Sequence, residues 1–236
     1  MTRYLIILAF IFFISCKAFA TWSIIIIDPK TKEIGIAAAS CTYNCYGIGR
    51  ILPGVGAIVV QAMSNNEARE KGIEMILAEA SPEQIIKALQ DTIFEPERQQ
   101  YAVITVKYID QAKIYTGSST KPFNGGLTDY GVTVQGNTLT NETELQAIMD
   151  AVQKGKKGLL HITDILMMAL EAGSNADGDK RCGEQKSTSA FIMVARPDDK
   201  KPYLDLSIFG QAQGKQNAVD LLRIKFDKWK KKHKNS

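Results

Sequence analysis

The sequence predicts an α+β fold built from stacked layers of strands and helices. Strand-like and helix-like segments come in separate blocks, in the order strands, two helices, strands, two helices, strands, helix. Such segregated blocks favour an α+β fold over a parallel sheet wound from β-α-β units. Several strands, such as residues 22–27, are continuous apolar runs that suit sheets covered on both faces, as in an α/β/β/α stack.

The strands are predicted from apolar runs and from enrichment in β-branched and aromatic residues. Residues 22–27 and 34–39 are apolar, and the polar connection that begins with Asp28-Pro29 predicts that they form a hairpin. By the same criteria, further strands are expected at residues 56–61, 101–108, 113–116, 130–135, 189–194 and 203–209.

The helices are predicted from apolar residues at helical spacing and from end signals. Ser81, Pro82 and Gln84 have the pattern of a capping box with proline at the first helical position. Helices are therefore expected at residues 66–80, 81–90, 142–153, 159–172 and 217–230.

The start of the chain has the pattern of a secretory signal peptide. Arg3 precedes an apolar stretch at residues 5–14, and the small-x-small triplet Ala18-Phe19-Ala20 fits a cleavage site. Cleavage of residues 1–20 would make Thr21 the first residue of the mature protein.

The mature protein, residues 21–236, is then expected in the periplasm or outside the cell. The apolar stretch is shorter than the ~20 residues of a membrane-spanning helix and no later segment reaches that length, so no membrane span is expected. One alternative stays open. Ile14-Ser15-Cys16 resembles the end of a lipobox, and processing there would leave a lipidated Cys16 and keep Thr21 inside the chain.

The mature chain is predicted to be a single domain with a basic C-terminal helix, because no low-complexity linker divides it. The full sequence has 29 Lys and Arg residues against 25 Asp and Glu, and much of the excess lies in residues 225–234. No other dense basic patch with interleaved aromatic residues occurs. The tail is therefore typical of a solvated helix end rather than of a nucleic-acid site.

Removal of the signal would leave three cysteines, and an oxidising compartment favours a disulfide. We expect Cys182 to pair with Cys41 or Cys45. His161, within a helical pattern, and His233, in the tail, lack ligand spacing to any cysteine, so neither a metal nor a cofactor is expected. This scarcity of histidine also argues against a Ser-His-Asp or Cys-His mechanism.

A free N-terminal threonine carries a nucleophile and a general base on one residue. The hydroxyl of Thr21 can attack a carbonyl while its own α-amine accepts the proton. The unperturbed pKa of an α-amine, about 8, is close to neutral pH. The predicted mature N-terminus therefore indicates a catalyst with Thr21 as its nucleophile.

Further residues are candidates for the same site. Asn137 would present its side-chain amide to a developing oxyanion. Asp179 would orient or charge-stabilise the amine of the nucleophile, and Arg181 would clamp a substrate carboxylate through two parallel hydrogen bonds. Ser40 and Gln61, near the ends of adjacent strands, would line the cleft.

Each of these residues also has a purely structural interpretation. Residues 135–137 read as an ordinary strand-end turn and residues 178–179 as an ordinary loop. Asp179 and Arg181 would then form a salt bridge, and Thr21 would merely begin a strand.

Short motifs follow one another along nearly the whole mature chain. They are Thr21-Trp22-Ser23-Ile24 with Asp28-Pro29, Gly35-Ile36-Ala37-Ala38-Ala39-Ser40, Gly54-Val55-Gly56-Ala57, Gln61-Ala62, Tyr130-Gly131-Val132-Thr133-Val134-Gln135-Gly136-Asn137, Gly178-Asp179-x-Arg181 and Tyr203-Leu204-Asp205-Leu206. This ordered set resembles the domain-of-unknown-function family 1028 (DUF1028), which is grouped with the N-terminal nucleophile (Ntn) hydrolases.

The resemblance implies a four-layer αββα sandwich of the Ntn-hydrolase type, with Thr21 on a strand at the sheet edge. It also implies hydrolysis of an amide bond. Because some members of the family carry peptidoglycan-binding modules, cell-wall amides are implied as a substrate class. Cytoplasmic members expose the threonine by losing the initiator methionine, and cleavage of the signal peptide would take that role here.

The leading hypothesis is therefore an exported threonine hydrolase that acts on an amide in a small-molecule, peptide or peptidoglycan-like substrate. The alternative is a non-catalytic envelope binding module that keeps the fold and uses the cleft only to hold a ligand. Whether Thr21 is free at the N-terminus discriminates between the two. The sequence leaves open whether the protein forms a homo-oligomer.

Overall fold

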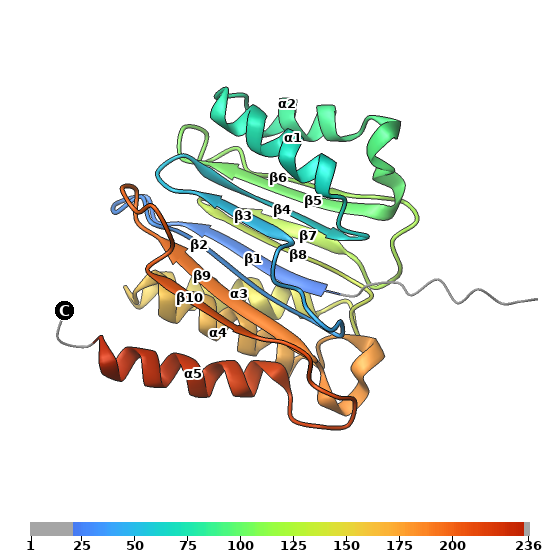
Figure 1. The fold of residues 1–236 in the computed structure, drawn as a ribbon, viewed down its shortest axis with the longest axis vertical. Helices are drawn as coiled ribbons and strands as arrows, with labels where there is room; N and C mark the ends of the chain where they lie inside the picture. Colours follow the sequence, from blue (N-terminus) through green and yellow to red (C-terminus); the bar gives the residue numbers. More distant parts are fainter. Residues whose placement is uncertain (1–20, 234–236) are drawn as a thin grey trace, which may run out of the picture.

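The computed structural model describes residues 21–233, so the predicted signal peptide and Cys16 lie outside the described residues. The α+β class is confirmed: the chain is a mixed fold of helices and two antiparallel sheets (Figure 1). The strands are β1 (Thr21–Ile27), β2 (Ile34–Ser40), β3 (Gly49–Leu52), β4 (Gly56–Ala62), β5 (Gln99–Thr105), β6 (Lys113–Thr116), β7 (Gly125–Asp129), β8 (Val132–Asn137), β9 (Ser189–Ala195) and β10 (Leu204–Ile208). The α-helices are α1 (Asn66–Leu77), α2 (Pro82–Leu89), α3 (Glu144–Lys157), α4 (Ile162–Asn175) and α5 (Ala218–Lys232).

The larger sheet has the strand order β10-β9-β2-β1-β8-β7. β1 pairs with β2 on one side and with β8 on the other, and both pairings are antiparallel. The expectation that the strand of Thr21 lies at the sheet edge is therefore wrong. β1 is an interior strand because it is apolar and buried on both faces, and Thr21 is its first residue.

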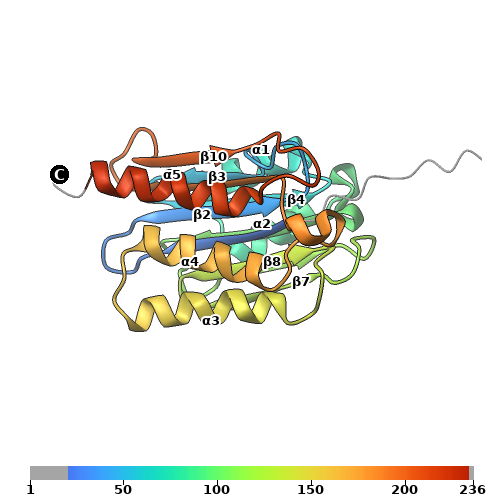
Figure 2. The same ribbon diagram turned by 90° about the horizontal axis from the view of Figure 1, so that it is seen from below.

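Alternate side chains of β1 face two different cores, as the pleat of a strand requires. Trp22, Ile24 and Ile26 belong to an apolar cluster with residues of α3, α4 and α5, the helices that cover one face of the larger sheet (Figure 2). Ile25 and Ile27 belong to a second cluster, which lies between the two sheets.

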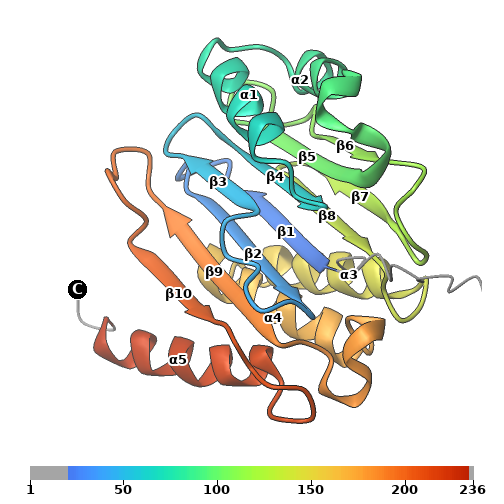
Figure 3. The same ribbon diagram turned by 45° about the vertical axis from the view of Figure 1, so that its right-hand side comes forward.

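The smaller sheet has the order β3-β4-β5-β6 (Figure 3). Val59 of β4 faces the larger sheet and packs in the cluster between the sheets. Ile58 and Val60 face the other way and pack with Ile76 of α1 and Ile85 of α2. Both helices therefore cover the outer face of the smaller sheet.

Two strands, β3 and β7, were not expected from the sequence. Each is short, contains glycine and has several exposed or half-buried residues, so neither has an apolar run or a regular alternation. β3 and β7 form because their backbones pair with those of β4 and β8. Both lie at sheet edges, where short strands are common.

One predicted helix start is confirmed by its capping hydrogen bonds, and one expectation, for His161, is corrected. The predicted capping box at Ser81 and Gln84 is present at the start of α2. His161, expected on a helix face, instead precedes α4 as its N-cap. Its Nδ1 accepts a hydrogen bond from the backbone N–H of Thr163 at 3.4 Å, which satisfies a donor that the first turn leaves open.

No helix within residues 21–233 combines the length and the apolar character needed to cross a bilayer.

Candidate functional site

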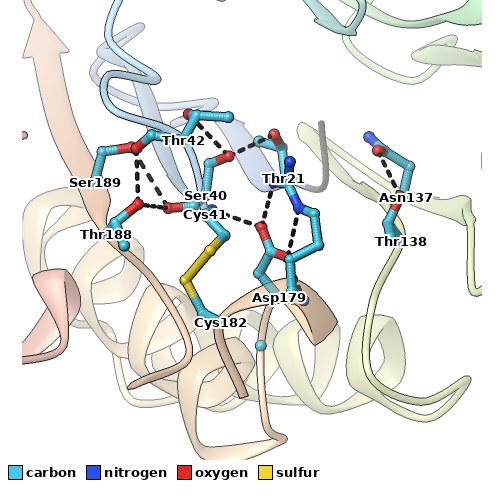
Figure 4. A network of polar contacts seen from close by, with 12 residues as sticks. Thr21, Ser40, Cys41, Thr42, Asn137, Thr138, Asp179, Cys182, Thr188 and Ser189 are labelled. Atoms are coloured by element: carbon cyan, nitrogen blue, oxygen red, sulfur yellow. Dashed lines mark hydrogen bonds and ion pairs between the residues drawn. A yellow bond between two sulfur atoms is a disulfide. The ribbon is translucent and has the colours of Figure 1, made fainter. Parts of the chain in front are cut away.

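Thr21 lies between two of the predicted site residues on neighbouring strands. In the strand register its Cα pairs with that of Ser40 on β2 and with that of Asn137 on β8. The Thr21 hydroxyl donates a hydrogen bond to Ser40 Oγ at 3.2 Å (Figure 4). Thr21 is only 3 % exposed. The antiparallel pairing thus brings together three polar residues that are far apart in the sequence.

Gln61 reaches Thr21 from the facing sheet. The expectation that Ser40 and Gln61 end adjacent strands is wrong, because β2 and β4 belong to different sheets. Gln61 Nε2 nevertheless donates to the backbone carbonyl of Thr21 at 3.3 Å and to Gln100 Oε1 at 2.7 Å. Its Oε1 accepts from the hydroxyl of Ser23 at 2.6 Å. Gln61 therefore links the two sheets at the end where β1 begins.

Asn137 is buried, with 1 % of its surface exposed. Its Nδ2 donates to Gln100 Oε1 at 3.3 Å, and its Oδ1 accepts from the hydroxyl of Thr138 at 3.5 Å. Because Gln100 also accepts from Gln61, Asn137 is joined to the polar cluster around Thr21. In Figure 4 it lies on the opposite side of Thr21 from Ser40.

Asp179 is fully buried and lies beside the residue that follows Ser40. Its carboxylate accepts from the backbone N–H of Cys41 at 2.5 Å and from the backbone N–H of Arg181 at 3.0 Å. The Arg181 guanidinium donates to the same carboxylate through Nε at 3.0 Å and Nη2 at 2.6 Å. This two-pronged ion pair is the interaction that we had assigned to a substrate carboxylate, and Asp179 occupies it within the chain.

A disulfide joins Cys41 to Cys182, with a Cα–Cα distance of 5.6 Å, and this confirms one of the two expected pairings. It ties the loop after β2 to the 3₁₀ helix Lys180–Gln185, whose N-cap is Asp179. Cys45 is the free cysteine among the described residues. Burial raises the pKa of its thiol to about 12, so it is not a thiolate nucleophile at neutral pH.

A cavity of about 300 Å³ opens beside Thr21. The loop after β2, the end of β4 and the start of α1 form its walls, and both Thr21 and Gln61 line it. Ser40, Asn137, Asp179 and Arg181 support residues at or near this cavity but do not line it. A larger cavity of about 500 Å³, lined by residues of α4, α5 and the β9–β10 region, holds none of the predicted site residues.

Buried polar residues between the sheets were missed by the sequence analysis. The Gln135 side chain donates to Ser23 Oγ at 2.7 Å, and Gln100 donates to Thr116 Oγ1 at 2.8 Å and to the backbone of Gly136 at 2.9 Å. The available signal was that Ser23 and Gln135 interrupt apolar strands, whereas Gln100 only precedes the apolar part of β5. Because the two sheets face each other, these polar side chains meet and form one hydrogen-bonded cluster.

A buried carboxyl, Glu144, was also missed. Burial raises its pKa to about 9, and the negative charges of Asp179 and Asp177 add to this effect. Glu144 is therefore neutral at pH 7, which avoids a second negative charge near Asp179. Among residues 21–233, no group of three or more His, Cys, Asp or Glu side chains is arranged to hold a metal ion.

The six predicted site residues therefore belong to one connected set of contacts. Thr21 contacts Ser40 and Gln61 directly, and Gln100 connects Asn137 to Gln61. Asp179 joins the set through the backbone of Cys41 and holds Arg181. Of these six residues, Thr21 presents a hydroxyl at the cavity, and the others surround it with two amides, a second hydroxyl and a carboxylate paired with a guanidinium.

The comparisons with known proteins agree with this fold. A family model described as a family of unknown function, DUF1028, matches residues 21–215. Protein SPO2555 from Silicibacter pomeroyi, whose crystal structure is assigned to DUF1028, is similar over 89 % of each chain, with 25 % identity and a TM-score of 0.73. No curated protein matches the sequence significantly. The match to most of the chain identifies it as a member of the DUF1028 family.

Proposed function

We propose that the protein is an exported amide hydrolase whose nucleophile is Thr21, freed as the N-terminal residue by removal of residues 1–20. The observation that carries the proposal is the position of Thr21. It is the first residue of β1, it lines the cavity with Gln61, and its hydroxyl is held by Ser40. A nucleophile needs an accessible space for a carbonyl and a fixed orientation, and this position offers both.

The reaction would proceed by acyl transfer. The Thr21 Oγ attacks the amide carbon as the α-amine accepts the hydroxyl proton, and the amide oxygen becomes an oxyanion. The C–N bond then breaks, and the leaving amine takes the proton from the α-ammonium group. Water attacks the resulting ester, the α-amine again accepts and returns a proton, and the acid product leaves Thr21 as it began.

The supporting residues take roles around that step. Asn137, opposite Thr21 on β8, would stabilise the oxyanion through its amide. Asp179 would stabilise the charge on the α-amine, with Arg181 holding the carboxylate in place. Ser40 would orient the Thr21 hydroxyl rather than act as a second nucleophile.

We further infer that the two facing sheets with their outer helices form the four-layer αββα sandwich of the Ntn hydrolases. The separate apolar clusters on both faces of each sheet support this assignment. Export is supported by the signal-peptide pattern and by the disulfide between Cys41 and Cys182, since disulfides persist in oxidising compartments.

The experiment is a screen of acyl-amides, including peptidoglycan fragments, with protein that begins at Thr21. Hydrolysis should be abolished in Thr21→Ala and partly retained in Thr21→Ser, which keeps both hydroxyl and α-amine. Thr128→Ala, which removes a hydroxyl from an exposed position on β7, is the matched control and should keep turnover. Turnover by Thr21→Ala equal to that of the unmodified protein would refute the assignment.

A second candidate function, an envelope binding module, is favoured by one observation. Asn137 and Asp179 do not line the cavity, and both are engaged in contacts within the chain. A binding module would hold its ligand equally well with Thr21→Ala and would hydrolyse nothing in the screen.

A further inference from the structure

A buried arginine lines the cavity beside Thr21. Arg69, on the inner face of α1, is only 8 % exposed. Its Nη2 donates to Asn66 Oδ1 at 2.5 Å, whereas Nε and Nη1 have no hydrogen-bond partner within residues 21–233. Two buried N–H-bearing atoms of one guanidinium therefore lack an acceptor. Buried polar groups are almost always paired, so this arginine calls for an explanation.

The charge of Arg69 is also unbalanced. No carboxylate of the described residues forms an ion pair with it, and its only side-chain partner, Asn66, is neutral. Burial lowers the pKa of Arg69, and the positive charge of Arg50 lowers it further, against a smaller opposite effect of Glu70. An unpaired buried charge is costly, and an anion within the cavity would relieve that cost.

From these contacts we infer that the cavity binds a carboxylate, and that Arg69 is its anchor. Because Nε and Nη1 have almost no accessible surface, the guanidinium would turn toward the cavity when the carboxylate binds and donate to it from these nitrogens. The adjoining part of the molecule would extend toward Thr21. The inference rests on the proposed function for one point only, namely that the bound molecule is the acyl part of an amide substrate. The substrate class is then an amide whose acyl group carries a carboxylate.

The cavity favours a carboxylate over a phosphate ester. Arg69 is the one cationic side chain among its lining residues, and the planar fork of a single guanidinium matches a planar carboxylate through two parallel hydrogen bonds. Arg181, which we had expected to clamp the substrate carboxylate, forms its two-pronged pair with Asp179 and does not line the cavity. We therefore assign the carboxylate-binding role to Arg69, which is not among the six site residues predicted from the sequence.

The turn that leads into α1 also faces the cavity. Ala62 and Ser64 both have positive φ angles, of 68° and 50°, and both line it. Side chains rarely adopt this backbone region, so the turn is held in a costly conformation by its surroundings. It places the start of α1, and with it Arg69, against the wall that contains Gln61.

The test is a binding measurement that needs no turnover. Pentanoate, pentanamide and butylphosphonate are titrated by calorimetry into protein that begins at Thr21. Pentanoate and pentanamide have the same shape and differ in charge. We expect pentanoate to bind about tenfold more tightly than pentanamide or more, the size of a charge-assisted hydrogen bond. Thr21→Ala should bind with the same preference, so failure of the catalytic proposal would not affect this result.

The variants assign the preference to one side chain. Arg69→Gln should bind pentanoate and pentanamide equally, and Arg69→Lys, which keeps the charge, should retain part of the preference. Lys71→Gln removes an equal charge from the exposed side of the same helix and should change nothing. Circular dichroism of each variant checks folding. Equal binding of the acid and the amide by the unmodified protein, binding of neither, tighter binding of the phosphonate, or an unchanged preference in Arg69→Gln would each overturn the inference.

Discussion

Asn137 lies directly opposite Thr21 on the neighbouring strand β8, and its amide donates to Gln100. The pairing fixes an amide donor next to the proposed nucleophile. Gln100 keeps a second donor, Gln61, if Asn137 is removed, so the buried amide oxygen of Gln100 would not be left unpaired.

We therefore predict that Asn137→Ala lowers kcat by roughly a hundredfold with little change in the free energy of unfolding. Steady-state kinetics and urea denaturation measure the two quantities. Asn124→Ala, a change of the same kind at an exposed position, should leave kcat unchanged. An Asn137→Ala enzyme with full kcat would remove Asn137 from the oxyanion site.

Ser40 is predicted to position the Thr21 hydroxyl. Loss of the hydrogen bond in Ser40→Ala should lower kcat by about fivefold, because one such bond contributes about 1 kcal/mol. Ser40→Thr restores a hydroxyl and should recover part of the rate. If Ser40 were itself the nucleophile, Ser40→Ala would abolish turnover, and single-turnover trapping would find the acyl group on Ser40.

The disulfide is predicted to stabilise the fold substantially. Cys41 and Cys182 are 141 residues apart in sequence, and closing so long a loop should contribute about 3 to 5 kcal/mol. Urea denaturation with and without a reductant measures this contribution. The double variant Cys41→Ala/Cys182→Ala should have the stability of the reduced protein and should not respond to reductant. Equal stability of the oxidised and reduced proteins would contradict the prediction.

Glu144 is predicted to make stability fall as pH rises. Its pKa is about 9 in the folded state and near 4.5 when unfolded, so between these values only the folded state keeps the proton. Unfolding then releases a proton and is favoured by higher pH. Glu144→Gln removes this effect and should be more stable than the unmodified protein by about 1 to 3 kcal/mol near pH 7.

The difference between Glu144→Gln and the unmodified protein should vanish near pH 4 and grow toward about pH 9. Urea denaturation across this range measures it. Glu142→Gln makes the same substitution at an exposed position two residues earlier and should shift nothing. A difference that does not vary with pH would show that Glu144 is ionised in the folded protein.

The sequence predicts those features of local structure that neighbouring residues determine. The capping box at Ser81 and the apolar run of β1 follow from neighbouring residues, whereas the sequence leaves both Cys41 and Cys45 open as partners of Cys182. The six predicted site residues also fall into one connected set of contacts, because the motifs lie at strand ends and in the turn at residues 178–181.

Features that depend on tertiary packing were not predictable. Gln61 reaches Thr21 because two sheets face each other, and no periodicity encodes that pairing. The guanidinium of Arg181 forms an ion pair with Asp179, whereas the side-chain partner of Arg69 is the neutral Asn66, although the two arginine side chains are chemically identical. Only the arrangement of their neighbours distinguishes them. His161 is a helix cap rather than a residue on a helix face because α4 begins at Ile162, three residues later than expected.

The central claim is that Thr21 acts with its own α-amine. It is tested most directly by a β-lactone probe that acylates free N-terminal threonines, applied to protein that begins at Thr21 and to protein with one alanine added before it. The added residue turns the basic amine into an amide that cannot accept a proton. Intact-mass and peptide mass spectrometry should find the probe on Thr21 in the first protein and none in the second. Equal labelling of Thr21 in the extended protein would contradict the mechanism.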